Sequence, residues 1–116
     1  MAETKMQSNP ATIRPCTAQD LVYKAYKRPY TGGSANVLNL FASGYYGDAP
    51  WEIFFVGVEG DSNTYKLMEK VPTIVYFIVT NYTASHSSGV GLPDLGDTVT
   101  IIDAYGEHKV PVEPIG

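Results

Sequence analysis

Three residues of this sequence have the side chains of a nucleophile, a general base and an orienting acid. Cys16, His86 and Asp103 are candidates because a thiol needs a base within hydrogen-bond reach, and the base needs a partner that orients it. They fall at a tail boundary, in a predicted loop and in a predicted strand, and nothing in their spacing brings them together. We therefore interpret Cys16 as a structural cysteine that is dispensable for activity, and we predict no catalytic residue.

Histidines and acids could also bind a metal ion. A metal site needs three or four convergent ligands, and His86 and His108, the two histidines, lack partners at the spacing that puts two ligands on one face. The oxygen-rich segments 59–63 and 94–97 match no complete calcium loop, and ordinary turn chemistry explains their acids. Residues 87–91 lack the lysine and the helix that follow a phosphate-binding loop. The sequence thus predicts neither a metal site nor a cofactor.

The segment 44–51 is the most suggestive stretch for recognition. It holds Tyr45, Tyr46, Asp48 and Trp51 between two predicted strands. Tyrosine and tryptophan combine a large apolar area with a polar group, which favours them at contact surfaces, and a flat ring beside a carboxylate could stack on a sugar. We take these four residues as binding candidates, with the two tyrosine rings presented outward. For Trp51 we favour the interpretation in which it begins a strand and points into the core, as a tryptophan commonly does in a small sandwich.

A second candidate for recognition is the segment 84–96, the longest predicted loop. Loops carry function more often than strands do, and this one contains His86, which we add to the binding candidates. The segment 44–51 ranks higher, because it alone combines three aromatic residues with an acid.

The elements that position these residues belong to one folded domain. The chain has 116 residues, 44% of them hydrophobic, and a net charge of −4, which is the balance of a folded domain and argues against nucleic-acid binding. The longest apolar run, residues 74–79, is far shorter than the roughly 20 residues of a membrane-spanning helix. No signal peptide is visible, so a cytoplasmic protein and a mature secreted form both fit. We predict a flexible tail over residues 1–15 and a single domain over residues 16–116.

Short runs of β-branched and aromatic residues, separated by Gly, Pro, Asn, Asp and Ser, predict an all-β fold. Residues 17–28 fit either a strand or one short helix. Short strands without alternating helices favour a two-sheet antiparallel β-sandwich, immunoglobulin-like or jelly-roll-like, with a small β-barrel as the alternative. The other predicted strands cover residues 36–42, 51–58, 64–69, 73–82, 97–104 and 108–113.

Two of these strands have a predicted place in the sheet. Residues 74–79 are apolar at both parities and suit a central strand, where truncating Phe77 or Ile78 to alanine costs about 3 kcal/mol. The last strand contains Lys109 and Pro111 and is predicted to be an edge, where truncating Lys109 costs under about 0.5 kcal/mol. The turn at 103–106, followed by a valine-rich strand, resembles hairpins of immunoglobulin-like surface domains.

Nine tyrosines in so short a chain favour a protein that works by contact. We predict a non-enzymatic binding module that acts through protein–protein contact, with a protein or a second copy as its partner. The alternatives are a self-assembling structural subunit and a carbohydrate-binding, lectin-like domain. An enzyme ranks last because no activated nucleophile is visible. On this hypothesis, Tyr45→Ala and Tyr46→Ala each weaken association by about 1–3 kcal/mol.

Overall fold

The structure, a computed structural model, describes residues 12–31, 33 and 35–115 as β-strands and their connections. No helix occurs in this part of the chain, so the all-β prediction is confirmed. The segment 17–28, which the sequence left open between strand and helix, lies mostly in a strand. The strands are β1 (Ile13–Pro15), β2 (Gln19–Pro29), β3 (Asn36–Tyr46), β4 (Glu52–Val58), β5 (Asp61–Lys70), β6 (Thr80–Ser87), β7 (Thr98–Asp103) and β8 (Gly106–Pro114).

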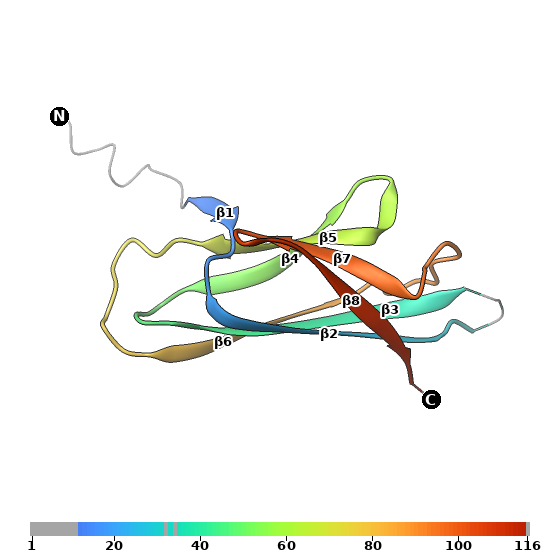
Figure 1. Ribbon diagram of the computed structural model, residues 1–116, viewed down its shortest axis with the longest axis horizontal. Helices are drawn as coiled ribbons and strands as arrows, with labels where there is room; N and C mark the ends of the chain where they lie inside the picture. Colours follow the sequence, from blue (N-terminus) through green and yellow to red (C-terminus); the bar gives the residue numbers. More distant parts are fainter. Residues whose placement is uncertain (1–11, 32, 34, 116) are drawn as a thin grey trace.

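All eight strands belong to one mixed sheet that curls into a half-barrel (Figure 1). Neighbouring strands follow the order β1-β5-β7-β8-β2-β3-β6, and β4 pairs with β5 off this path. Most ladders are antiparallel, but β5–β7 and β2–β8 are parallel. Among the described strands, β4 and β6 approach each other without forming a ladder. The two-sheet sandwich is therefore not confirmed, and the curled sheet fits the barrel alternative in part.

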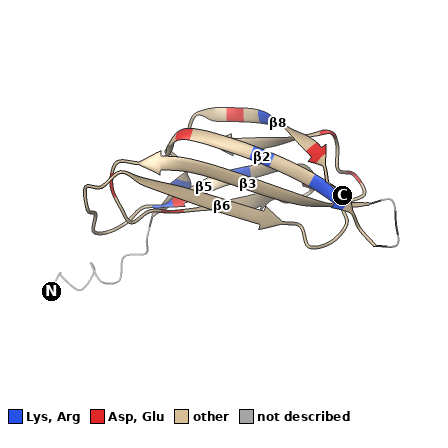
Figure 2. Ribbon diagram, turned by 90° about the horizontal axis from the view of Figure 1, so that it is seen from below, with Lys and Arg blue, Asp and Glu red and all other residues tan. Residues whose placement is uncertain are grey.

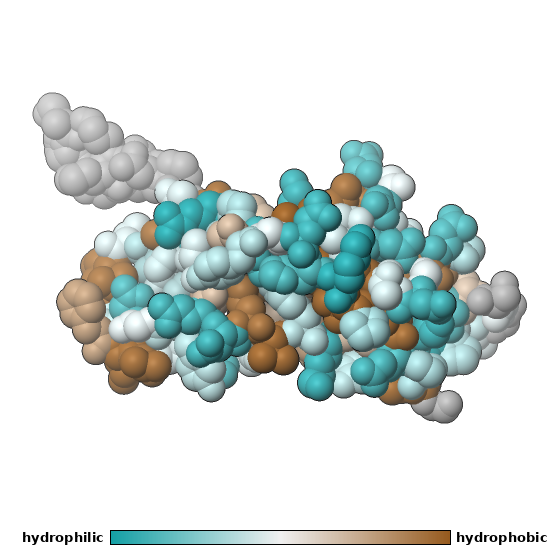
Figure 3. All heavy atoms as spheres, viewed as in Figure 1, coloured by the Kyte–Doolittle hydropathy of each residue, from teal (hydrophilic) through white to brown (hydrophobic). Residues whose placement is uncertain are grey.

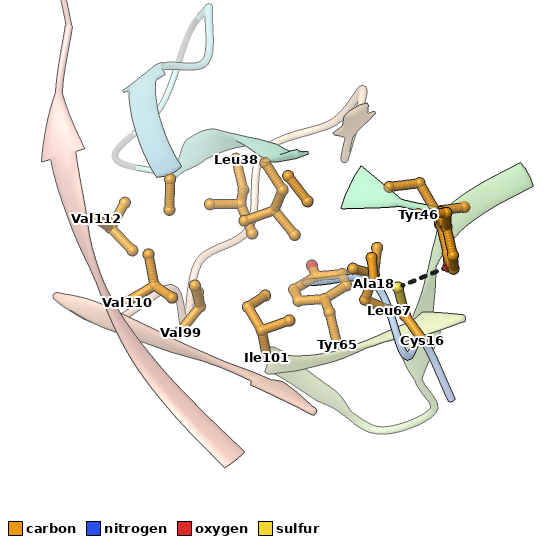
Figure 4. Packing of buried hydrophobic residues seen from close by; sticks show 14 residues of the cluster. Cys16, Ala18, Leu38, Tyr46, Tyr65, Leu67, Val99, Ile101, Val110 and Val112 are labelled. Atoms are coloured by element: carbon orange, nitrogen blue, oxygen red, sulfur yellow. Dashed lines mark hydrogen bonds between the residues drawn. The ribbon is translucent and has the colours of Figure 1, made fainter. Parts of the chain in front are cut away.

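The core fills the inside of the curl. In β3, the two-residue period of a strand turns Leu38, Leu40 and Ala42 inwards, and each is at most 3% exposed. Side chains from the facing strands meet them there, which puts strands far apart in the sequence around one cluster (Figure 4). From the other elements the cluster includes Ala18, Tyr65, Leu67, Val99, Ile101, Val110 and Val112.

The start of β2 is irregular, and a glycine of β3 makes room for it. Asp20 has a φ of 55°, a left-handed conformation that aspartate adopts more readily than most residues. A Cβ on Gly44 would lie 2.8 Å from both Ala18 Cβ and Leu21 Cδ2, which is too close for any larger side chain. The missing side chain thus lets the chain before β2 pack directly on β3.

The predicted central strand over residues 73–82 is wrong for most of its length. Residues 73–79 connect β5 to β6, which begins only at Thr80, and Phe77 is 90% exposed. The physical reason is the alternation of faces: β6 turns Tyr82 and Ala84 towards the core and small polar residues outwards. Residues 74–79 are apolar on both faces, so a strand made of them would need cover on both sides at this position. β6 has one apolar face and one polar face, and it pairs with β3 instead. Because β6 ends at Ser87, the predicted loop 84–96 is also shorter than expected.

The C-terminal hairpin of β7 and β8 forms as an antiparallel pair, but its last strand is not an edge. The end of β8 pairs in parallel with Ala25–Lys27 of β2 through Val112–Pro114. Pro111 lies just before this pairing begins, so its missing N–H interrupts no bond between the two strands. The prediction of an edge strand was wrong because the sequence does not distinguish a proline that precedes the paired residues from a proline on an unpaired edge.

The predicted tail over residues 1–15 is only partly covered by the structure. Residues 1–11 lie outside the described residues, whereas Ile13–Pro15 form β1 and pair with the end of β5. The next residue, Cys16, continues this contact by donating its backbone N–H to the carbonyl oxygen of Leu67, 2.9 Å away. Residues 13–15 of the predicted tail therefore form a strand.

Candidate binding surface

The predicted recognition segment 44–51 begins inside a strand. Because β3 continues through residue 46, strand alternation sends its last two tyrosines to opposite sides. Tyr45 lies on the outer face with 42% of its surface exposed, whereas Tyr46 points into the core and is 6% exposed. The expectation that both rings are presented outward is therefore wrong for Tyr46.

Trp51 is held on three sides at the end of this segment. Its ring stacks on Tyr46 with the centroids 4.2 Å apart and the planes 4° from parallel. The indole Nε1–H donates to Asp48 Oδ1 at 2.6 Å, and the guanidinium carbon of Arg14 lies 5.8 Å from the ring centre. Trp51 packs against the core cluster and is partly exposed. This is closer to the interpretation in which the tryptophan belongs to the core.

A buried carboxylate adjoins these rings. The Glu69 side chain is fully buried and accepts hydrogen bonds from the Tyr46 hydroxyl at 2.7 Å, Arg14 Nε at 2.6 Å and the Thr17 backbone N–H at 2.6 Å. Burial by itself would raise the pKa of Glu69, but these hydrogen bonds outweigh it and lower the pKa below its ordinary value. Glu69 is thus a charged anchor that fastens the chain between β1 and β2 to β5.

The three residues considered for nucleophilic chemistry do not form one site. The thiol of Cys16 is buried 3.4 Å from the Tyr46 hydroxyl, and burial raises its pKa, which makes it a poor nucleophile. His86 packs against Tyr65, with the ring centroids 5.3 Å apart. In the described part of the chain, no hydrogen bond joins Cys16, His86 and Asp103 to one another.

His86 also lies apart from the segment 47–51. It faces Leu40 across the β3–β6 ladder, whereas Tyr46 faces Thr80, so about 20 Å of strand separates the two positions. The structure therefore brings Tyr46, Asp48 and Trp51 together, and it leaves Tyr45 and His86 outside this group.

A second polar cluster surrounds Asp103. The carboxylate accepts hydrogen bonds from the Tyr23 hydroxyl at 2.5 Å and from the Tyr105 backbone N–H at 2.8 Å, and His108 Nε2 lies 3.0 Å away. Burial and the bond to Asp103 raise the pKa of Tyr23, so its hydroxyl stays protonated and donates. These groups line a cavity of about 460 Å³ together with Asp20. Neighbouring groups form hydrogen bonds to both oxygens of Asp103. The cluster therefore links β2, β7 and β8 to one another.

The exposed connection between β5 and β6 is the most unusual surface of the molecule. We call residues 74–79 the apolar end. All six of its side chains are apolar or aromatic, and all are exposed. In Figure 3, hydrophobic residues gather where Figure 1 shows this connection, at the left of the view. The exposed fractions are Ile74 69%, Val75 37%, Tyr76 67%, Phe77 90%, Ile78 59% and Val79 75%.

The apolar end is fixed to the predicted recognition segment. Ala49 and Tyr76 form an isolated antiparallel bridge, in which the Ala49 N–H donates at 2.9 Å and the Tyr76 N–H donates at 2.7 Å. Trp51, Ile74 and Tyr76 also line one cavity of about 380 Å³. The segment that we predicted to bind and the segment that we predicted to be core thus form one continuous surface.

Charges are sparse on and around this surface. No Asp, Glu, Lys or Arg occurs from residue 71 to residue 93. Glu52 and Lys70 line the cavity that Trp51, Ile74 and Tyr76 share. An apolar centre with a charged rim is the usual composition of a protein contact surface.

Two further observations bear on the kind of site that the chain offers. Within residues 12–31, 33 and 35–115, no group of three or more His, Cys, Asp or Glu side chains is placed to hold a metal ion. In the same residues, no helix has the length and apolar character needed to cross a membrane.

Comparison of the chain with models of known protein families, with curated proteins and with solved structures finds no match. Function therefore has to be inferred from the surface of this chain itself.

Sequence reasoning recognised the apolar end but assigned it to the core. The sequence carried no signal that distinguishes the two, because an uncharged apolar run without alternation fits a buried strand as well as an exposed surface. The Glu69 anchor was missed, although Tyr65, Leu67 and Glu69 share one parity of β5.

Proposed function

We propose that this protein is a binding module that acts through protein–protein contact, with the apolar end as its contact surface. The observation that carries the proposal is the exposure of six consecutive apolar residues, from 37% at Val75 to 90% at Phe77. Scattered apolar residues are normal on protein surfaces, but a contiguous apolar patch marks an interaction site.

The size of the patch supports the same conclusion. From these exposed fractions, the six residues present on the order of 800 Å², about the area that one partner buries in a standard protein–protein interface. A partner that covers the apolar end would therefore bury enough surface for a specific complex.

The backbone of the patch is held in place before binding. The bridge between Ala49 and Tyr76 fixes its middle, and the stack of Trp51 on Tyr46 supports the neighbouring segment from the core side. A surface that is already ordered loses less conformational entropy when a partner binds. Phe77 and Tyr76 are the expected anchors, because large aromatic side chains contribute most to binding energy.

The lectin-like alternative has less support. Sugar stacking needs a free ring face beside an available carboxylate, but Tyr46 covers one face of Trp51 and Asp48 accepts the indole N–H of the same residue. Tyr45 is exposed on the outer sheet face, away from both.

The proposal is tested by quantitative affinity capture from an extract of the cells that produce the protein. The immobilised chain is compared with Phe77→Ser and with Val22→Ser, a matched control that replaces another apolar side chain, 54% exposed, on the outer face of β2. We expect Phe77→Ser to lose at least about tenfold of the bound partner, as for an aromatic anchor, and Val22→Ser to retain it. Equal capture by all three proteins would contradict the proposal.

A further inference from the structure

The apolar end leads directly into β6, and we propose that β6 is a docking edge on which a second copy of this chain pairs its own β6 antiparallel. The inference rests on the proposed function in one respect, namely that the chain works by protein contact. It goes further in naming the partner and the backbone groups that recognise it.

The outer edge of β6 carries unused hydrogen-bonding groups. The Ser88 N–H donates to Leu38 of β3, so antiparallel alternation points the backbone of the even-numbered residues of β6 towards β3. The N–H and C=O groups of the odd-numbered residues consequently point away from β3. Within the described residues, no strand pairs with this side of β6. The outward groups belong to Asn81, Thr83, Ser85 and Ser87.

The β6 edge also lacks the features that normally keep an edge strand single. Natural edges are protected by charged side chains, prolines or bulges, and β6 contains none of these over eight residues (Figure 2). The opposite end of the sheet differs, because β4 begins with Glu52 and its register shifts between Gly57 and Val58. β4 approaches β6 but forms no ladder with it, so the outward backbone groups of β6 have no strand partner within the described residues.

The edge is complementary to itself. A two-fold axis at Ala84 would place residue 81 opposite residue 87 of the other copy, and residue 83 opposite residue 85. Every outward backbone group of β6 would then have a partner, and the two strands would match over their full length. Such self-matching is the property that an interface between two identical chains needs.

The charge distribution and the apolar surface fit a second copy of this chain as the partner. The chain carries a net charge of −4, but the uncharged stretch 71–93 lets two copies meet there without repulsion. The antiparallel arrangement directs the apolar end of each copy towards the turn that follows β6 in the other. Val90 in that turn is 55% exposed, so apolar surface meets apolar surface at both ends of the paired strands.

The first test is sedimentation velocity over a concentration series of the full chain, with a matched pair of variants at one position. Thr83→Pro removes an outward N–H that no strand of the same chain uses, whereas Thr83→Ala shortens the side chain and keeps the N–H. We expect dimers for the parent and Thr83→Ala. For Thr83→Pro we expect a dissociation constant about 10- to 100-fold higher, since one bond is lost from each copy. Circular dichroism and a cooperative thermal transition verify the fold.

A second variant keeps the proposal open to refutation if Thr83→Pro does not fold. Ser85→Lys leaves the backbone intact and places a charge on an exposed side chain of the edge, where the two copies would repel each other. We expect it to be monomeric at concentrations at which the parent is a dimer. A parent chain that stays monomeric, or a Ser85→Lys variant that dimerises as well as the parent, would overturn the proposal.

The register has its own test. In a mixture of Thr83→Cys and Ser85→Cys chains, mild oxidation is expected to give a disulfide between the two variants, because facing Cα atoms of a ladder lie within disulfide range. Neither variant alone is expected to cross-link, and the native Cys16 is buried. Cross-linking of each variant only to itself would contradict this register.

These outcomes are distinguishable from failure of the proposed function. If the parent is monomeric while Phe77→Ser still loses a captured protein, the β6 inference fails and the apolar contact surface stands. If dimers form through β6 but Phe77→Ser captures as much partner protein as the parent, the proposed role of the apolar end fails and the edge pairing stands.

Discussion

Glu69 and Phe77 are eight residues apart, and their environments are the reverse of what their chemistry suggests. The glutamate is fully buried near the end of β5, whereas the phenylalanine is 90% exposed in the connection that follows. The carboxylate is tolerated inside because Tyr46, Arg14 and Thr17 donate hydrogen bonds to it.

The comparison shows that partners, more than polarity, decide which side chain is buried here. Glu69 has all its partners within the chain, so its burial stabilises the fold. Phe77 and its neighbours have no packing partners of comparable extent within the described chain. Their apolar surface stays in water, and burying it against another molecule would lower the free energy. The Glu69 anchor therefore stabilises the fold, whereas the apolar end is the surface that we propose for association.

The largest effect is expected from removing the buried carboxylate. Glu69→Ala deprives four donor groups, on Tyr46, Arg14 and Thr17, of their acceptor and leaves a cavity, so we expect the free energy of unfolding to fall by about 3–5 kcal/mol. Urea denaturation followed by circular dichroism measures this change. A loss under about 1 kcal/mol would mean that Glu69 is not the anchor described, and Glu113→Ala, on an exposed position of β8, serves as the control.

A smaller loss is expected from removing one donor to the same carboxylate. Tyr46→Phe keeps the ring that stacks on Trp51 and deletes only the hydroxyl between Glu69 and Cys16. We expect a loss of about 1.5–3 kcal/mol, the range for a hydrogen bond to a charged group. Tyr45→Phe, the neighbouring tyrosine on the outer face, should leave the denaturation midpoint unchanged. Equal effects of the two changes would contradict the different placement of these rings.

Acid should weaken the same anchor in a defined direction. The folded-state pKa of Glu69 is lowered, so its charged form stabilises the fold fully above the ordinary carboxyl pKa of about 4.3, and this stabilisation is lost as pH falls through the folded-state value. Urea unfolding at pH 7, 5, 4 and 3 should show a stability difference between the parent and Glu69→Gln that shrinks only below about pH 4. A difference that is constant with pH would contradict a charged Glu69.

Much of the fold could be predicted from the sequence, because strand signals are local. Alternation of apolar and polar residues marked β3, β5 and β7, and the hairpin of β7 and β8 followed from its turn at Ala104 and Tyr105. The order of the strands could not be predicted, since the parallel pairings of β2 with β8 and of β5 with β7 join segments far apart in the chain.

The candidate surface was predicted less well, and the reason is physical. Tyr46 and Trp51 are as suitable for a core as for a contact surface, and only the direction of the strand decides which side each ring faces. Residues 74–79 are equally ambiguous, because an apolar run reads the same whether the chain covers it or a partner does. The sequence thus placed Tyr46 on the surface and residues 74–79 in the core, and the structure has the reverse.

The most direct test of the central claim, that residues 74–79 lie outside the core, is the unfolding free energy of Phe77→Ala measured beside that of Leu38→Ala. Leu38 is 0% exposed, so its truncation should cost about 2–5 kcal/mol. Phe77 has few side chains to lose contact with, and we expect Phe77→Ala to lie within about 0.5 kcal/mol of the parent at a concentration at which the chain is monomeric. If Phe77→Ala instead costs as much as Leu38→Ala, the segment belongs to the core and the apolar end is not a contact surface.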